Sequence, residues 1–150
     1  MTDLQHLFHD LIRFETELWN AVDARLRSEF DLPLSRFEPM QVIDRLTSCR
    51  VHDIARELSI TVGGTSKLVD RIEASGYCLR RSNPDDRRSS IITLTTAGQR
   101  ILADATAAFQ DELELRLGSV LFPREVQQLS TTLAKLRRAA ARIDTAGKTA

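Results

Sequence analysis

The sequence is poor in several features that mark particular classes of protein. It has two cysteines in 150 residues, Cys49 and Cys78, and no CxxC pair. Neither a disulfide scaffold nor a zinc knuckle is therefore expected, and a reducing compartment fits. No apolar run approaches the roughly 20 residues that a membrane-spanning helix needs, and the first residues lack the basic-then-apolar order of a secretion signal. We expect a cytoplasmic protein with no membrane partner.

The residue combinations on which most catalysis depends are also missing. No Ser-His-Asp set, carboxylate pair or glycine-rich phosphate loop stands out, and an enzyme needs at least one such constellation. His6, His9 and Asp10 lie on adjacent turns of one predicted helix, but no thiolate and no other histidine except His52 is there to complete a metal site. We expect no enzyme, no bound metal and no cofactor.

Net charge gives no sign of a nucleic-acid partner, because 21 basic residues balance 21 acidic ones. The charge is uneven along the chain, however. Residues 1–31 carry seven acids and three bases, and residues 135–150 carry five bases and one acid. Zero net charge argues against unspecific binding to polyanions, but it leaves room for local basic surfaces. The length suits one domain.

Three long helices are predicted near the ends of the chain. Apolar residues recur at helical spacing through residues 1–30, and a second long helix is expected from Thr95 or Thr96 to about Leu117. The third begins at Pro123, where the missing N–H costs little. Its apolar residues form a heptad seam, which either packs on the domain's own core or, as the three long stripes favour, is shared with a second chain. These residues are Val126, Leu129, Leu133, Leu136, Ala140 and Ile143.

Between the long helices the pattern predicts a helix-turn-helix followed by a hairpin. Residues 51–58 and 62–74 are expected to be helices joined by the turn 59–61, an arrangement common in DNA-binding proteins. Residues 77–81 and 90–94 alternate like the two strands of a ribbon. The positions of the second helix expected to face inward are Val62, Leu68, Val69 and Ile72.

The other face of the helix at 62–74 is small and polar. Gly63 and Gly64 would let the start of the helix approach phosphates or base edges closely; the alternative is that they only loosen its first turn. Lys67 and Arg71 suit phosphate or guanine contacts, whereas Asp70 is expected to pair with an arginine inside the protein. The residues expected to contact DNA are Thr61, Val62, Gly63, Gly64, Thr65, Ser66, Lys67 and Arg71.

The loop between the two strands, Asn83-Pro-Asp-Asp-Arg-Arg-Ser-Ser90, carries dense charge. Phosphates repel a carboxylate, so Asp86 is expected to support the loop by pairing with an arginine. Arg88, or alternatively Arg87, is then left to enter a minor groove, where narrow A·T tracts favour arginine. A hairpin tip whose charges only keep it soluble is the other interpretation, and the preceding helix-turn-helix disfavours it.

Residues 51–59, 66–76, 83–88 and 94–98 together resemble the MarR family of bacterial transcriptional regulators. The resemblance covers essentially the whole chain in the family's order, although Asn83 stands where the family usually has aspartate. It implies a mainly α fold of the α+β winged helix-turn-helix type, with six helices and a two- or three-stranded antiparallel wing. It further implies a homodimer held by the first, fifth and sixth helices.

The resemblance also implies how the chain is organised and what it does. Residues 1–150 would form a single MarR-type domain, with a DNA-binding lobe at 35–98. At the start of this lobe the residues themselves predict a helix N-cap at Ser35, with Glu38 as its partner in a capping box. Dimerisation helices would lie at 1–30 and 99–145. The dimer would bind a palindromic operator, most simply as a repressor, with recognition helices in major grooves ~34 Å apart and the 83–90 wings in minor grooves.

Relatives in this family often bind small aromatic or phenolic anions between the dimer helices and the winged module, and such a ligand would release the DNA. Two alternatives stay open. One is a redox-responsive regulator that uses Cys49 or Cys78, the latter near Arg80 and Arg81, which would lower its pKa. The other is a winged-helix module that binds protein and has no DNA target. The candidate ligand-binding residues are Arg13, Phe14, Trp19, Phe37, Met40 and Phe109.

Overall fold

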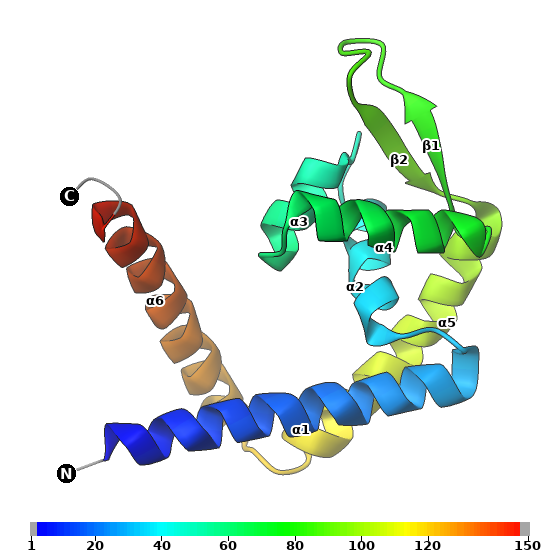
Figure 1. Cartoon of the computed structure of the whole chain (residues 1–150). Helices are drawn as coiled ribbons and strands as arrows, with labels where there is room; N and C mark the ends of the chain where they lie inside the picture. Colours follow the sequence, from blue (N-terminus) through cyan, green and yellow to red (C-terminus); the bar gives the residue numbers. More distant parts are fainter. Residues whose placement is uncertain (1–2, 148–150) are drawn as a thin grey trace. The chain divides into compact units, whose positions relative to one another are not determined.

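The computed structural model describes residues 3–147, which are mainly helical (Figure 1). The chain divides into two compact units, Met1–Glu112 and Leu113–Ala150. The predicted fold class is confirmed: within the described residues there are six α-helices, and the wing is a two-stranded antiparallel sheet. The elements are α1 (Leu4–Phe30), α2 (Leu34–Arg45), α3 (Val51–Leu58), α4 (Val62–Ala74), β1 (Cys78–Ser82), β2 (Ser90–Leu94), α5 (Thr96–Leu113), the π-helix η1 (Glu114–Gly118) and α6 (Pro123–Gly147).

The helix α1 is anchored in the first unit by its C-terminal half. Val22 and Leu26 are buried, whereas the apolar residues of the first turns are exposed. The guanidinium of Arg25 donates to the carboxylate of Glu112 on α5 over 3.2 Å, and Glu112 is itself buried. This ion pair ties the C-terminal half of α1 to α5. The apolar stripe on the N-terminal half of α1 is exposed.

The start of α2 differs from the expected capping box at Ser35 and Glu38. The helix begins at Leu34 with Pro33 as its N-cap, and no side chain caps it locally. Instead the Leu34 N–H donates to Oδ1 of Asp23 on α1, at 2.8 Å. The expected capping box is therefore wrong: the free N–H at this helix start is satisfied from another helix, which local spacing does not reveal.

The core of the first unit gathers around α2, which packs against α1, α3, α4 and β2. The Phe37 ring lies 5.0 Å from that of Phe109 on α5, measured between centroids. These contacts hold the helix-turn-helix against the longer helices, so α4 is fixed in position by the packing of its buried face. The largest fully buried apolar side chains are Leu26, Leu32, Phe37, Met40, Ile54, Val69, Ile72 and Ile92.

The helix-turn-helix has the predicted boundaries. Helix α3 starts with the Arg50 N–H donating to Asp53 (2.9 Å) and ends at Ser59, which adopts the left-handed conformation with φ 55°. The Thr61 hydroxyl then accepts from the Gly64 N–H at 3.1 Å and caps α4. Two local features thus define a turn of three residues: a C-cap residue in the left-handed conformation and a threonine N-cap.

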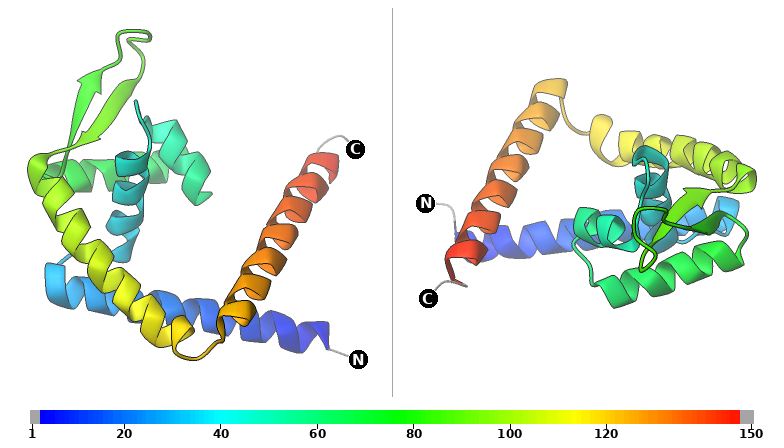
Figure 2. Two further views of the ribbon diagram at one scale, coloured as in Figure 1. Left: turned by 180° about the vertical axis from the view of Figure 1, so that it is seen from behind. Right: turned by 90° about the horizontal axis from the view of Figure 1, so that it is seen from above.

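The wing is the hairpin of β1 and β2, which pair antiparallel from Cys78↔Leu94 to Ser82↔Ser90. Figure 2 shows its tip projecting beyond α3 and α4. At its base the Thr95 hydroxyl accepts from the Gly98 N–H over 3.0 Å and so caps α5, in agreement with one of the two predicted caps. A side chain at Gly98 would overlap the Tyr77 carbonyl, so glycine lets α5 start directly against β1.

The second unit begins with a π-helix where the sequence predicts a continuing α-helix. The predicted long helix to Leu117 ends as an α-helix at Leu113, and η1 takes its place up to Gly118. Helix α6 begins at Pro123 as predicted, and across its described length no residue is buried. Its seam residues Val126, Leu129, Leu133, Leu136 and Ile143 are 40–69% exposed. Among the described residues the seam is therefore exposed.

No helix among the described residues combines the length and hydropathy that crossing a membrane requires.

Candidate nucleic-acid interface

The outward face of α4 presents the small and polar residues that the sequence placed there. Thr61, Gly63, Gly64, Lys67 and Arg71 are exposed and Ser66 is half-buried. Val62, which was counted among the inward positions, is 43% exposed and belongs to this face instead. The helix is therefore buried through Val69 and Ile72 and open along a stripe that starts at its N-terminus.

Thr65 departs from the predicted set of DNA-contacting residues. It is fully buried, and its hydroxyl donates to the Thr61 carbonyl over 2.7 Å. Its side chain does not reach the outer surface of α4, so this prediction is corrected. A signal was available in the sequence: Thr65 lies four residues before Val69 and seven before Ile72, which is the spacing of the buried stripe.

The two glycines of α4 have different surroundings. A Cβ at Gly63 would meet none of the described atoms within 4 Å, whereas a Cβ at Gly64 would lie 3.0 Å from the Thr61 hydroxyl oxygen. Neither glycine has the positive φ that would itself require glycine. The capping hydroxyl thus explains the small residue at Gly64, and nothing inside the described chain explains the one at Gly63.

The wing loop is ordered by its own side chains. Asn83 is buried; its Oδ1 accepts from the Asp85 N–H, and its Nδ2 donates to the Ser89 hydroxyl, both at 3.0 Å. Oδ1 of Asp86 accepts from the Arg88 backbone N–H, also at 3.0 Å. In the described chain Asp86 forms no ion pair with a guanidinium, so the expected arginine partner is corrected to a backbone one. Arg87 and Arg88 are exposed.

Asp70 pairs with an arginine, as expected. Its Oδ1 lies 2.7 Å from Nη2 of Arg80 on β1, and the same guanidinium is 3.3 Å from Glu73 Oε1. Arg80 was missed as a member of this surface because the partners are seven and ten residues apart and on different elements. The packing of β1 against α4, not helical spacing, brings them together.

The six candidate ligand-binding residues do not line one cavity. Phe37 and Met40 are fully buried in the core, and Phe109 is half-buried against Phe37. On α1, Arg13 pairs with Glu17 over 3.1 Å, while Phe14 and Trp19 are about 40% exposed, at 43% and 38%. A small hollow at Trp19 also touches Glu15 and Thr16.

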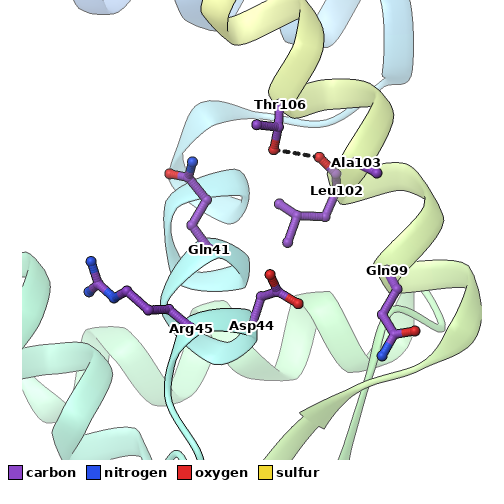
Figure 3. A pocket seen from close by; sticks show the side chains of 7 residues that line it. All are labelled: Gln41, Asp44, Arg45, Gln99, Leu102, Ala103 and Thr106. Atoms are coloured by element: carbon purple, nitrogen blue, oxygen red, sulfur yellow. Dashed lines mark hydrogen bonds between the residues drawn. The ribbon is translucent and has the colours of Figure 1, made fainter.

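A larger groove lies between α2 and α5 (Figure 3). Its volume is about 720 Å³, and polar side chains line much of it. None of the six predicted ligand residues lines it. The lining residues are Gln41, Asp44, Arg45, Gln99, Leu102, Ala103 and Thr106.

Both cysteines are free and fully buried. Burial, and to a smaller extent the Glu73 carboxylate, raise the pKa of the Cys78 thiol to about 11, against a lowering by Arg80 that is smaller still. Burial and Asp53 likewise raise the pKa of Cys49 to about 11. The expected lowering of the Cys78 pKa by arginines is therefore wrong, because desolvation of the thiolate is the larger effect.

The histidines near the N-terminus form no metal site within the described part of the chain, where no group of three or more His, Cys, Asp or Glu side chains could hold an ion. His6 Nε2 lies 3.3 Å from an Asp10 carboxylate oxygen, one turn along α1.

Comparisons with known proteins agree with this geometry. The MarR family model matches residues 32–90. The chain is 25% identical over 142 residues to the multiple antibiotic resistance protein MarR of Escherichia coli, covering 91% of this chain and 99% of that one. It is 27% identical over 111 residues to an HTH-type transcriptional regulator of Bacillus subtilis, YfiV, covering 74% and 69%.

Solved structures of DNA complexes share the fold. The MarR family regulator Sco3205 of Streptomyces coelicolor, in complex with DNA, superposes with a TM-score of 0.85 at 20% identity, covering 90% of this chain and 86% of that one. The S. aureus MepR–DNA complex gives a TM-score of 0.78 at 25% identity, covering 93% and 99%. These relatives are regulators, not enzymes. The family match, these relatives and the shared fold support a DNA-binding transcriptional regulator of the MarR family, of the winged helix-turn-helix type.

Proposed function

We propose that this regulator is a homodimeric, cytoplasmic repressor that binds a palindromic operator and is released from it by a small molecule. The observation that carries the proposal is the exposed polar stripe of α4 beside a wing with two exposed arginines. Together they offer a helix for a major groove and a cationic loop for the neighbouring minor groove.

In the proposed complex, α4 enters the major groove with its N-terminal end first. Lys67 and Arg71 contact phosphate or guanine, and Gly63 permits close approach of the helix backbone. Thr61, Val62, Gly64 and Ser66 complete the contact surface, and Thr65 is left out because its side chain is buried. The 83–90 wing carries Arg88 into the minor groove, with Arg87 as the alternative.

The homodimer is supported by apolar surface that the single chain does not cover. The proposed dimerisation helices comprise residues 1–30 and 99–145, flanking the DNA-binding lobe at 35–98. Leu4, Phe8 and Ile12 on α1 are 51–76% exposed, and the α6 seam is open over nearly three heptads. A second chain that covers these stripes would also space two recognition helices for a palindrome, ~34 Å apart.

The effector is proposed to be a small aromatic or phenolic anion bound between the lobe and the dimer helices. The groove between α2 and α5 supports this location, because the Gln41 and Gln99 amides give it donors for an anion while Leu102 gives it an apolar wall. The exposed Arg13, Phe14 and Trp19 of α1 are the residues that a second chain would bring to such a site. Phe37, Met40 and Phe109 lie in the core behind it.

Selection of bound sequences from a random DNA pool tests the operator. We expect a palindrome bound with a steep salt dependence. Replacing Arg88 by alanine should weaken binding and make the slope of log K against log salt shallower by about one, with an unchanged circular dichroism spectrum. Arg87→Ala is the matched variant, since it removes the same charge from the same loop.

The results separate the roles of the two arginines. A larger loss for Arg88→Ala assigns the groove contact to Arg88, and a larger loss for Arg87→Ala moves it to Arg87. Unaltered affinity of both variants contradicts the wing contact. Repeating the selection with benzoate-type acids present tests the effector, and Trp19→Ala should keep operator binding while losing any response to the acid.

A further inference from the structure

The Arg80 side chain connects the wing to the recognition helix through several acceptors at once. Its Nη2 lies 2.7 Å from Asp70 Oδ1 and 3.4 Å from the Ser66 carbonyl oxygen, and its Nη1 lies 3.3 Å from Glu73 Oε1. The Arg80 backbone N–H also donates to Glu73 Oε2, at 3.2 Å. A planar guanidinium can bind several oxygens in this way, whereas an ammonium group has no such fork.

The partners of Arg80 lie on or beside the surface proposed to face DNA. Asp70 falls three residues after Lys67 and four after Ser66, so it shares their stripe of α4. Its side chain is 62% exposed, whereas that of Arg80 is 25% exposed. The Asp70 carboxylate would therefore face the phosphates of bound DNA. The guanidinium of Arg80, which is largely covered, binds this carboxylate from the side of β1.

The charge of α4 makes this carboxylate important. Along Val62–Ala74 the charged residues are Lys67 and Arg71 against Asp70 and Glu73, which cancel. By itself the recognition helix therefore brings no net positive charge to a polyanion. With Arg80, from β1, three positive charges face two carboxylates, which leaves an excess of one positive charge, and affinity for DNA depends on such an excess.

We propose that Arg80 is a positioning residue of the DNA interface, which holds the Asp70 and Glu73 carboxylates against β1 so that neither faces bound DNA as a free negative charge. The proposal rests on recognition of DNA by α4. Arg80 contacts no base in this arrangement; it acts through the two carboxylates, and it couples the orientation of α4 to the base of the wing.

A thermodynamic cycle tests this role. Operator binding is measured for Arg80→Gln in the wild-type background and again in a background carrying both Asp70→Asn and Glu73→Gln. In the wild-type background the substitution releases two carboxylates and should weaken binding on the order of tenfold at low salt. In the second background there is no carboxylate to release, and the loss should fall to about twofold or less.

Arg81→Gln is the matched control, because it removes the same charge from the next residue of β1. Arg81 is exposed and has no ion pair within the described residues, so its effect should be equal in both backgrounds. Arg80→Lys keeps the charge without the fork and should lose only part of the affinity. If Arg80→Gln unfolds, Arg80→Lys takes its place in the cycle.

Equal losses for Arg80→Gln in the two backgrounds would overturn the proposal, since Arg80 would then act as a plain positive charge or as a fold support. A loss of operator affinity that is the same at 50 and at 200 mM salt would also overturn the proposal. Salt screens the repulsion between the released carboxylates and the phosphates, so the loss should become smaller as salt rises. Failure of the wild-type protein to bind any selected DNA contradicts the proposed function instead, and the two outcomes are therefore distinguishable.

Discussion

At the residue scale, Gly63 and Gly64 separate the needs of the fold from those of DNA recognition. A glycine in a helix costs up to about 1 kcal/mol relative to alanine, and this cost requires a reason. For Gly64 the reason is the Thr61 hydroxyl at 3.0 Å, and for Gly63 the surroundings are open. We expect Gly63→Ala to raise the free energy of unfolding by a few tenths of a kcal/mol and to weaken operator binding.

Gly64→Ala is the comparison for this prediction. Its new Cβ would press on the capping hydroxyl of Thr61, so the free energy of unfolding should fall or stay level instead of rising. Urea unfolding and operator titration of both variants are the measurements. Tight operator binding by a stabilised Gly63→Ala protein would show that the open position does not serve DNA approach.

The two buried thiols predict a dependence of stability on alkaline pH. In the folded protein each cysteine thiol has a pKa of about 11, whereas a thiol of the unfolded chain has a pKa near 9.0. Stability from this source is therefore complete below pH 9 and is lost as pH rises from 9 to about 11. Between pH 8 and pH 10 the wild type should lose about 1 kcal/mol more than Cys78→Ala does, as measured by urea unfolding. Identical losses would mean that the folded Cys78 thiol ionises as readily as the unfolded one.

At the element scale, the wing loop depends on a carboxylate oxygen and not on an ion pair. Asp86 Oδ1 accepts the Arg88 N–H, and an asparagine has an oxygen in the same place. We expect Asp86→Asn to retain operator affinity to within about twofold, and Asp86→Ala to lose about fivefold, as expected when a bond worth ~1 kcal/mol orders the loop. Operator titration of both variants is the measurement. If Asp86→Asn loses as much as Asp86→Ala, the carboxylate charge matters and the original expectation of an arginine partner is restored.

The bounds of the helices can be predicted from the sequence where local residues set them, and cannot where another element does. The bounds of α3 and α4 follow from local signals, because the Ser59 turn, the Thr61 cap and the apolar spacing all lie within a few residues. The start of α2 depends on Asp23, eleven residues earlier on another helix. The partner of Asp70 depends on the packing of β1 against α4. Contacts between elements are set by packing, and one sequence carries no local record of them.

The candidate site divides along the same line. The exposed residues of α4 and the wing arginines follow from residue type and spacing, whereas Thr65 is buried because it lies on the same helical stripe as Val69 and Ile72. The proposed effector groove could not be predicted, since its residues come from α2 and α5 and share no motif. Chemistry that sits on one element is visible in the sequence, and chemistry built between elements is not.

At the scale of the whole molecule, the exposed seam of α6 supports the proposed partner chain. Seam leucines that stay 40–54% exposed along a 25-residue helix are unfavourable in water, and burying the exposed part of each one would gain roughly 1 kcal/mol. The exposed first turns of α1 add a second uncovered stripe. A regulator that reads a palindrome needs two recognition helices, so the covering chain and the second reader are proposed to be the same molecule.

A charge in the seam should therefore abolish both assembly and operator binding. Leu133→Asp places a carboxylate among the seam leucines, and we expect a monomer in sedimentation equilibrium whose operator affinity is lower by roughly 100-fold or more, because the second recognition helix is no longer linked to the first. Thr131→Asp adds the same charge on the opposite side of α6, where the Thr131 hydroxyl bonds only to the Gln127 carbonyl of its own helix. That variant should remain dimeric and bind DNA. A Leu133→Asp protein that stays dimeric would place the dimer interface away from this seam, and a monomer with full operator affinity would contradict palindrome reading by a dimer.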